Sequence, residues 1–178
     1  MALLSRQQIV NALERLGQLA AADGCTLRLT VVGGAAIVLG FNTRESTHDI
    51  DAVFLPPPEP KKIREWAAVV ASELDWPDDW LNDAAKGYVV GLTSGPVLLS
   101  APGIEVCRAK TQQLLAMKLC AWRDDVDIGD AGHLLSELAR VQKREEIWQS
   151  VIPHLIPGHE LKAQYAFDDL WESLYGHP

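Results

Sequence analysis

Two aspartates, Asp49 and Asp51, stand one residue apart inside the apolar segment DIDAVF. Side chains of a β-strand alternate between its two faces, so a strand here would place both carboxylates on one face. Two carboxylates held side by side repel each other unless a cation compensates them. Mg²⁺ suits such a site, because it binds one or two protein carboxylates and keeps positions for water and phosphate oxygens. The pattern favours a divalent-metal site, and a solvated strand face or a turn is the alternative.

Two glycines, Gly33 and Gly34, close the apolar run that precedes the aspartates. Glycine lets a backbone approach a ligand closely, and the amides at the start of a following helix bind anionic phosphate. The order of glycine pair, short helix and DIDAVF therefore predicts one combined site for metal and phosphate. A tight strand-to-helix turn is the alternative for the glycine pair taken alone.

Secondary-structure signals around these residues indicate how they are held. We expect an amphipathic first helix, a strand that ends at the glycine pair, a short helix after it, and a second strand stopped by the proline run PPPEP. Proline then opens another amphipathic helix. The corresponding segments are MALLSRQQIVNALERLG, GCTLRLTVVGG, AAIVLGF, DIDAVFL and PKKIREWAAVVASELD.

The rest of the chain changes character near residue 110. The segment WPDDWLNDAAKG reads as a polar connector, whose tryptophans are either partner surface or a small extension of the core. Strands are expected in YVVGLT and GIEVCRA, and helices from Thr111 onward. We therefore expect an α/β (α+β) fold with an α/β part over residues 1–110. A helical part over 111–178 packs on it, as a second domain or within a single one.

Composition narrows the function. The chain has 178 residues, 48% hydrophobic and 22% charged, which is typical of a globular protein. Its formal charge of −8 and pI near 5.0 argue against broad nucleic-acid binding, which usually needs a basic face, although a local basic groove stays open. No apolar run reaches the roughly 18 residues of a membrane helix, so we expect no membrane partner. The N-terminal segment lacks the apolar block of a signal peptide, which favours a cytoplasmic protein.

The cysteines Cys25, Cys107 and Cys120 are widely spaced. They form no CxxC motif and have no histidine at metal-ligand spacing. We expect reduced, partly buried packing residues rather than a structural zinc site.

The segment from GGAAIVLGF to DIDAVF resembles the signature of the polymerase-beta-like nucleotidyltransferase superfamily, in which a GG or GS turn precedes a DxD with hydrophobic neighbours. Within that superfamily it is similar to small bacterial nucleotidyltransferases related to the toxin component of abortive-infection toxin–antitoxin systems. The later segment LLAMKLCAWRDDVDIGDAGHLL resembles their second conserved block. The resemblance implies a nucleotidyltransferase-like mixed sheet flanked by helices.

Members of the superfamily transfer a nucleoside monophosphate from an NTP to a hydroxyl or similar acceptor, using metal ions held by two or three carboxylates. By this resemblance, Gly33 and Gly34 would hold the nucleotide phosphates, and Asp49 and Asp51 would bind Mg²⁺, or Mn²⁺ in its place. In many relatives a third carboxylate comes from a later strand. Glu105 is the candidate here, as a metal ligand or as the base for the acceptor hydroxyl, and an outward-facing strand residue is the alternative.

The second block supplies further candidates. Lys118 lies among apolar residues on nearly every side of its helix, so its ammonium must reach water or meet an anion. The resemblance suggests that this anion is the triphosphate. Arg123 would bind phosphate or pair with Asp127 at i, i+4. Asp127 and Asp130 match the Asp-x-x-Asp of the block, and the alternative is that they begin and cap the next helix.

The chain also departs from the pattern. The spacing from Gly34 to Asp49 is slightly longer than in the superfamily, and Arg44 is displaced by about one residue from the usual arginine before the DxD. Arg44 remains a candidate for nucleotide binding. Thr47 would share the Asp49 face and bond a carboxylate or a phosphate, or serve only as a β-former.

The resemblance implies a metal-dependent nucleotidyltransferase whose acceptor is a protein, a tRNA end or a small molecule. It also implies a place in a toxin–antitoxin pair, with a cognate antitoxin as partner. Two other interpretations of the sequence stay open. One is a non-catalytic nucleotidyltransferase fold that binds a nucleotide or a partner. The other is a structural domain in which the aspartates are merely solvated.

Overall fold

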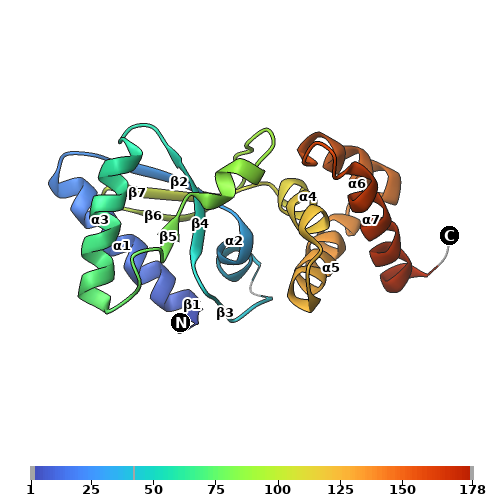
Figure 1. The fold of residues 1–178 in the computed structure, drawn as a ribbon, viewed down its shortest axis with the longest axis horizontal. Coiled ribbons are helices and arrows are strands. Elements are labelled where there is room, and N and C mark those ends of the chain that lie inside the picture. The colour runs from blue at the N-terminus through green and yellow to red at the C-terminus, as the bar shows by residue number, and fades with distance from the viewer. Residues whose placement is uncertain (1–2, 42, 177–178) are drawn as a thin grey trace. The chain divides into compact units, whose positions relative to one another are not determined.

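The computed structural model describes residues 3–41 and 43–176 (Figure 1). It confirms the expected mixed α/β fold with a helical C-terminal part. The chain divides into two compact units. The first comprises the residues up to Gly87 together with Ser94–Ala109, and the second comprises Tyr88–Thr93 together with the residues from Lys110 onward.

The first unit is built on a five-stranded mixed sheet with the order β5-β4-β2-β7-β6. Strand β2 pairs antiparallel with β4 and parallel with β7, while β5 runs parallel to β4 and β6 antiparallel to β7. The expected strands DIDAVFL and GIEVCRA are confirmed as β4 and β7. The strands span Leu27–Val31 (β2), Ile50–Leu55 (β4), Leu81–Asn82 (β5), Val97–Ala101 (β6) and Ile104–Arg108 (β7).

One face of this sheet carries the core of the first unit. The register places alternate residues of β2, β4 and β7 on that face, among them the buried Leu29, Phe54 and Val106. Helix α1 (Arg6–Ala22) packs here, so closely that a Cβ on Gly17 would lie 2.5 Å from the Ile104 side chain. Helix α3 (Pro60–Leu74) lies against α1 and begins with the expected proline.

Two short strands hold the segment before the aspartates. Strand β1 (Leu4–Ser5) pairs antiparallel with β3 (Ser46–Thr47), with Leu4 opposite Thr47. Ser5 also caps α1 in a capping box with Gln8. The start of α1 and the approach to β4 are therefore joined by backbone pairing.

The prediction of a strand in YVVGLT is wrong. Tyr88 ends a 3₁₀ turn, η1 (Ala84–Tyr88), and residues 89–93 are irregular. The carbonyls of Val90 and Gly91 accept hydrogen bonds from Gln113 Nε2 instead of pairing with a strand. The strand lies further on, in β6, within a segment whose Gly and Pro residues suggest a break between strands.

The connector WPDDWLNDAAKG contains two short elements that were not predicted from the sequence. It contains β5 and η1, and Trp80 is fully buried. The Trp80 indole donates to the Ala67 carbonyl of α3 at 2.9 Å. Of the two alternatives for the connector tryptophans, the extension of the core therefore holds for Trp80.

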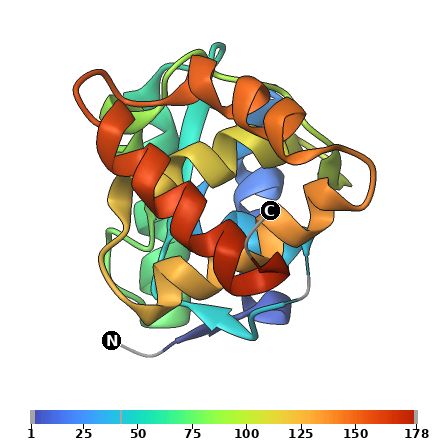
Figure 2. The ribbon, with the colours of Figure 1, turned by 90° about the vertical axis from the view of Figure 1, so that its right-hand side faces the viewer.

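The second unit is helical. Figure 2 shows α4 (Thr111–Ala121) surrounded by α5 (Asp125–Ala139), α6 (Arg144–Val151) and α7 (Glu160–Tyr175). Helix α4 contacts each of the other three, and a helix that is apolar nearly all round needs such a central position. A 3₁₀ turn, η2 (Ile152–His154), follows α6.

The three cysteines are free, as expected, with Cys120 buried and the other two partly buried. In the described part of the chain, no helix is both long enough and apolar enough to cross a membrane.

Candidate active site

The junction between β2 and α2 (Gly33–Gly40) lies directly against the second aspartate. The Val32 amide donates to the Asp51 carbonyl at 2.9 Å, and Gly33 then adopts a φ of +59°. A Cβ built on Gly33 would lie only 3.1 Å from Asp51 Oδ2. Glycine is needed here both for the left-handed backbone and for the close approach to the carboxylate.

Gly34 brings the first turn of α2 against two other candidate residues. A Cβ at Gly34 would lie 2.4 Å from Thr47 Oγ1 and 3.2 Å from Arg44 Nη1. Thr47 is buried, and Arg44 Nε donates to the Ser46 carbonyl at 2.7 Å. The displacement of Arg44 in the sequence therefore does not remove it from the glycine pair.

Helix α2 is fixed at its other end by Arg6. Arg6 Nη1 donates to the Leu39 carbonyl at 2.6 Å and to the Val38 carbonyl at 3.1 Å. A cation at the C-terminal carbonyls complements the helix dipole, whose positive end is the first turn at Gly33. The amides of a helix's first turn lack intrahelical acceptors, so the start of α2 suits an anionic group.

The two aspartates lie at the start of β4 and are both partly exposed. Asp49 stands one residue before the strand, and Asp51 pairs in register with Asn82 of β5. The Asn82 amide donates through Nδ2 to Asp49 Oδ2 at 3.1 Å. Asn82 was not predicted as a site residue, because a two-residue strand has no periodicity to reveal it.

The chemistry of these side chains fits a hard divalent cation. Two carboxylates at one strand end supply charged oxygen ligands, and the start of α2 beside them suits phosphate. Within the described ranges, no three side chains of His, Cys, Asp or Glu gather into a cluster that would enclose a metal. The arrangement suits Mg²⁺ or Mn²⁺, which keep several positions for water and substrate oxygens.

Glu105 is not brought to this pair. It is an exposed residue of β7, in register with Arg28 of β2, and Arg28 pairs in turn with Leu55. Leu55 is four residues beyond Asp51, which is about 13 Å along a strand. Glu105 is therefore not brought together with the aspartates, which fits the alternative of a polar strand residue on the surface.

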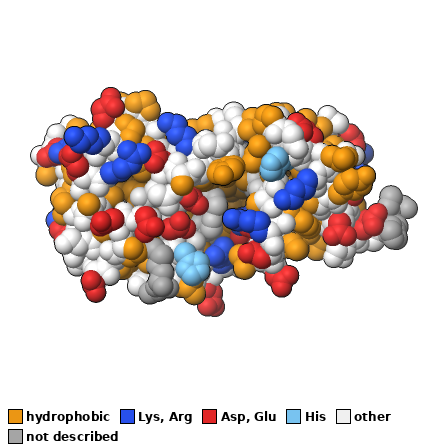
Figure 3. Space-filling view, viewed as in Figure 1, with side chains coloured by type: hydrophobic (Ala, Val, Ile, Leu, Met, Phe, Trp, Pro, Cys, Tyr) orange, Lys and Arg blue, Asp and Glu red, His pale blue; other side chains and the backbone are white. Residues whose placement is uncertain are grey.

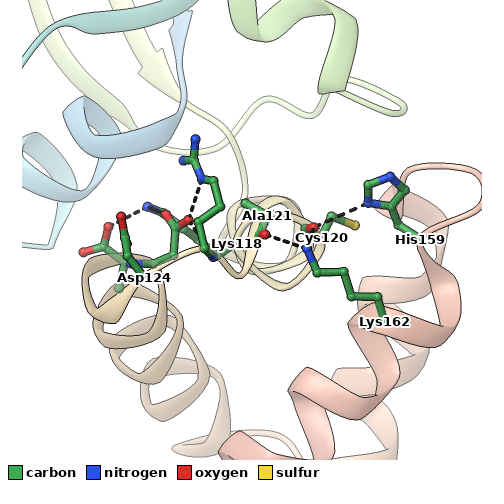
Figure 4. Close-up of polar contacts among 9 residues, drawn as sticks. Lys118, Cys120, Ala121, Asp124, His159 and Lys162 are labelled. Carbon is green, nitrogen blue, oxygen red and sulfur yellow. Dashed lines mark hydrogen bonds and ion pairs between the residues drawn. The ribbon is translucent and has the colours of Figure 1, made fainter.

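The remaining candidates form a cluster within the second unit (Figure 4). Lys118, only 9% exposed, donates to Asp127 Oδ1 at 2.8 Å and lies 2.7 Å from Asp130 Oδ2. The burial of Lys118 predicted an anionic partner, and the two carboxylates of α5 supply it, while binding of the triphosphate stays a prediction. Both carboxylates are themselves buried.

Asp127 also forms an ion pair with Arg123. Arg123 Nε donates to Asp127 Oδ2 at 2.9 Å, which confirms the pairing at i, i+4. Burial raises the pKa of Asp127, but the hydrogen bonds and positive charges of Arg123 and Lys118 outweigh it, so its pKa lies below the usual value.

The cap of α5 is Asp124, whose carboxylate accepts from the Asp127 amide at 2.9 Å. Asp127 lies in the first turn of the helix and Asp130 lies further along it. Of the alternative that the two aspartates begin and cap this helix, the start holds for Asp127, while the capping is wrong for both residues.

Lys162 and His159 contact the C-terminal end of α4 (Figure 4). Lys162 Nζ donates to the carbonyls of Cys120 and Ala121 at 2.9 and 2.7 Å. His159 Nδ1 lies 3.4 Å from the same Cys120 oxygen. Both side chains contact carbonyls that a helix end leaves without intrahelical donors.

Comparison with known proteins finds one matching protein family. No curated protein and no solved structure matches the chain. Residues 7–138 match the model of a protein family described as "Nucleotidyltransferase of unknown function (DUF6036)". The matched range covers well over half of the chain and includes the glycine pair, both aspartates and the Lys118 cluster. The chain therefore belongs to this family of nucleotidyltransferases.

Proposed function

We propose that the protein is a metal-dependent enzyme that transfers a nucleoside monophosphate from an NTP to an acceptor. The observation that carries the proposal is the close approach of Gly33, in a left-handed conformation, to the Asp51 carboxylate. This approach sets a helix start that suits phosphate beside a carboxylate pair that suits a divalent cation. Nucleotidyl transfer needs both groups in one place.

Each residue of the first unit has a role in the proposal. Asp49 and Asp51 hold Mg²⁺, with Mn²⁺ as its substitute. The amides at Gly33 and Gly34 bind phosphate oxygens, and Arg44 adds positive charge next to Gly34. Thr47 packs against Gly34 and sets the position of the helix start.

The reaction joins an acceptor oxygen to the α-phosphorus of the NTP. The bond from that phosphorus to the oxygen bridging to the β-phosphate breaks, pyrophosphate leaves, and the acceptor proton passes to water. The bound metal would neutralise the negative charge that builds on the phosphate oxygens. The protein residues bind and align the triphosphate, which removes much of the entropic cost of bringing the reactants together.

Lys118 and Arg123 take a structural role in this proposal. Two buried carboxylates already compensate the ammonium of Lys118, and Arg123 is bonded to one of them. A triphosphate would have to displace those carboxylates and leave them buried without their cation. We therefore assign Lys118, Arg123, Asp127 and Asp130 to the stability of the second unit.

The acceptor is a protein, a tRNA end or a small molecule, and we include a place in a toxin–antitoxin pair with a cognate antitoxin as part of the proposal. Positive and negative side chains are interspersed on the face seen in Figure 3. On each unit taken by itself, the described side chains in that view form no continuous basic surface of the kind that binds long nucleic acid. A tRNA end would need only a local contact.

The test is incubation of the protein with each α-³²P-labelled NTP and Mg²⁺, alone and with total tRNA or lysate protein. We expect label on one acceptor class with the wild type and none with Asp49→Ala/Asp51→Ala. Asp78→Ala, which removes an exposed aspartate of the connector, is the matched control and should keep wild-type transfer. Equal labelling by the double variant would contradict the proposal.

A second candidate is a nucleotidyltransferase fold that binds a nucleotide or a partner without catalysis. It is favoured by the neutral Asn82 beside the aspartates and by the lack of a three-ligand acidic cluster in the described ranges. This candidate predicts NTP binding that survives Asp49→Ala/Asp51→Ala and no transfer by either version. Equilibrium dialysis with the labelled NTPs separates the two functions.

A further inference from the structure

The Asn82 side chain is held on three sides next to the carboxylate pair. Its Nδ2 donates to Asp49 Oδ2 at 3.1 Å and to the Asp79 carbonyl at 3.4 Å, while its Oδ1 accepts from the Ala84 amide at 3.0 Å. Both the NH₂ group and the oxygen of the Asn82 amide are therefore hydrogen-bonded, and the NH₂ group faces the Asp49 carboxylate.

The direction of this amide follows from the chemistry of its partners. The Ala84 N–H can only donate, so the amide must turn its oxygen toward Ala84. The NH₂ group then faces Asp49, and an ionised carboxylate can only accept. The reverse orientation would place two donors together and two acceptors together.

The strand that carries Asn82 is anchored on both sides of it. Two residues earlier, the fully buried Trp80 bonds to the Ala67 carbonyl of α3. One residue later, Arg64 of α3 donates to both carboxylate oxygens of Asp83, at 2.8 and 2.9 Å. A donor fixed in this way can hold the carboxylate it contacts in one orientation.

We propose that Asn82 is a positioning residue for Asp49. Its hydrogen bond engages Oδ2 and so fixes the rotation of the carboxylate, which would leave Oδ1 to bind a cation. This inference deepens the proposed function and rests on it, because it assumes that Asp49 binds a metal. As a neutral donor, Asn82 orients the carboxylate without adding a third negative charge to the pair.

Mn²⁺ binding to the full chain, followed by electron paramagnetic resonance without nucleotide, tests this role. Outer-shell partners of metal ligands typically contribute about 10- to 100-fold to metal affinity, so we expect Asn82→Ala to weaken Mn²⁺ binding by that factor. Asn11→Ala removes an exposed amide from α1 of the same unit and should bind Mn²⁺ like the wild type. A circular dichroism spectrum of each variant verifies folding.

The isosteric change Asn82→Asp gives a second readout that needs no bound metal. It replaces the donor by a third carboxylate, so we expect a lower Tm in EDTA than for Asn82→Ala and a partial recovery when Mn²⁺ is added. A wild-type Tm of Asn82→Asp in EDTA would show that residue 82 does not contact Asp49, which overturns the proposal.

The remaining outcomes separate the positioning role from the proposed function. Wild-type Mn²⁺ affinity in Asn82→Ala, with affinity lost in Asp51→Ala, would overturn the role of Asn82 and leave the metal site standing. Absence of Mn²⁺ binding by the wild type would overturn the metal site and the role of Asn82 together.

Discussion

Two pairs of closely spaced aspartates occupy different environments in this protein. Asp127 and Asp130 are buried in the helical unit, where Lys118 bridges them. Asp49 and Asp51 are partly exposed at a strand end, where the backbone of Gly33 approaches one and a neutral amide contacts the other. The comparison teaches that spacing alone does not assign a role to an acidic pair. What surrounds the carboxylates assigns it.

The largest expected effect comes from breaking the buried ion pairs between Lys118 and its two carboxylates. Lys118→Met removes the cation and leaves two buried carboxylates, and breaking a buried pair in this way costs about 3–5 kcal/mol. Urea denaturation should show a loss of that order in the free energy of unfolding. Lys86→Met, at an exposed lysine, is the control and should change it by less than about 0.5 kcal/mol. An equal, small loss in both variants would contradict the structural role of Lys118.

A smaller effect separates backbone strain from the carboxylate contact. Gly33 and Gly24 both have left-handed backbone, with φ of +59° and +70°, but a Cβ on Gly24 meets nothing within 4 Å. We expect Gly33→Ala and Gly24→Ala each to lower the free energy of unfolding by about 1 kcal/mol or slightly more. Only Gly33→Ala should also weaken Mn²⁺ binding, measured by titration. Unchanged Mn²⁺ affinity in Gly33→Ala would remove the basis for the site at this junction.

The pH dependence of stability tests the role of Asp127 in the buried pair. Asp127 has a lowered pKa in the folded state, so its contribution to stability is present above its unfolded pKa of about 4 and is lost as pH falls through the folded value. Asp127→Asn should therefore be less stable than the wild type at neutral pH, and the difference should shrink below about pH 4. Urea denaturation curves recorded at a series of pH values, from neutral down to about pH 2, measure this difference. A difference that stays constant with pH would contradict the assignment.

The smallest effect concerns a second lysine of the helical unit. Lys162 is exposed and donates to two carbonyls at the end of α4. Lys162→Met should cost about 0.3–1 kcal/mol, the usual value of a cation at a helix C-terminus. Urea denaturation measures the loss in the free energy of unfolding for Lys162→Met and for Lys118→Met. Equal losses would contradict the different roles of a lysine at a helix end and a lysine between two buried carboxylates.

The sequence predicted best where a local pattern matched a local structure. DIDAVFL alternates as a strand must, and it forms β4. The burial of Lys118 correctly predicted an anionic partner, but the partner's identity depended on the turn at Trp122, where φ is +39° and the chain reverses into α5. Resemblance favoured a triphosphate, whereas tertiary packing supplied Asp127 and Asp130.

Features set by distant contacts were missed. Leu81–Asn82 is a strand only because it pairs with β4, and its two residues carry no period of their own. The run YVVGLT has the composition of a strand, yet its carbonyls bond to Gln113 and His154 of the helical unit. Glu105 has apolar neighbours, as expected for a site residue, but the register of β7 carries it away from the aspartates. These positions depend on pairing partners that a single segment does not reveal.

The most direct test removes one carboxylate from each pair by an isosteric change and measures Mn²⁺ affinity by electron paramagnetic resonance. Asp51→Asn should weaken Mn²⁺ binding by about tenfold or more, because it removes a charged oxygen ligand. Asp127→Asn should bind Mn²⁺ within about twofold of the wild type, since its carboxylate pairs with Lys118 and Arg123. Equal affinities in the two variants, or loss of binding in Asp127→Asn alone, would contradict the different roles assigned to the two pairs.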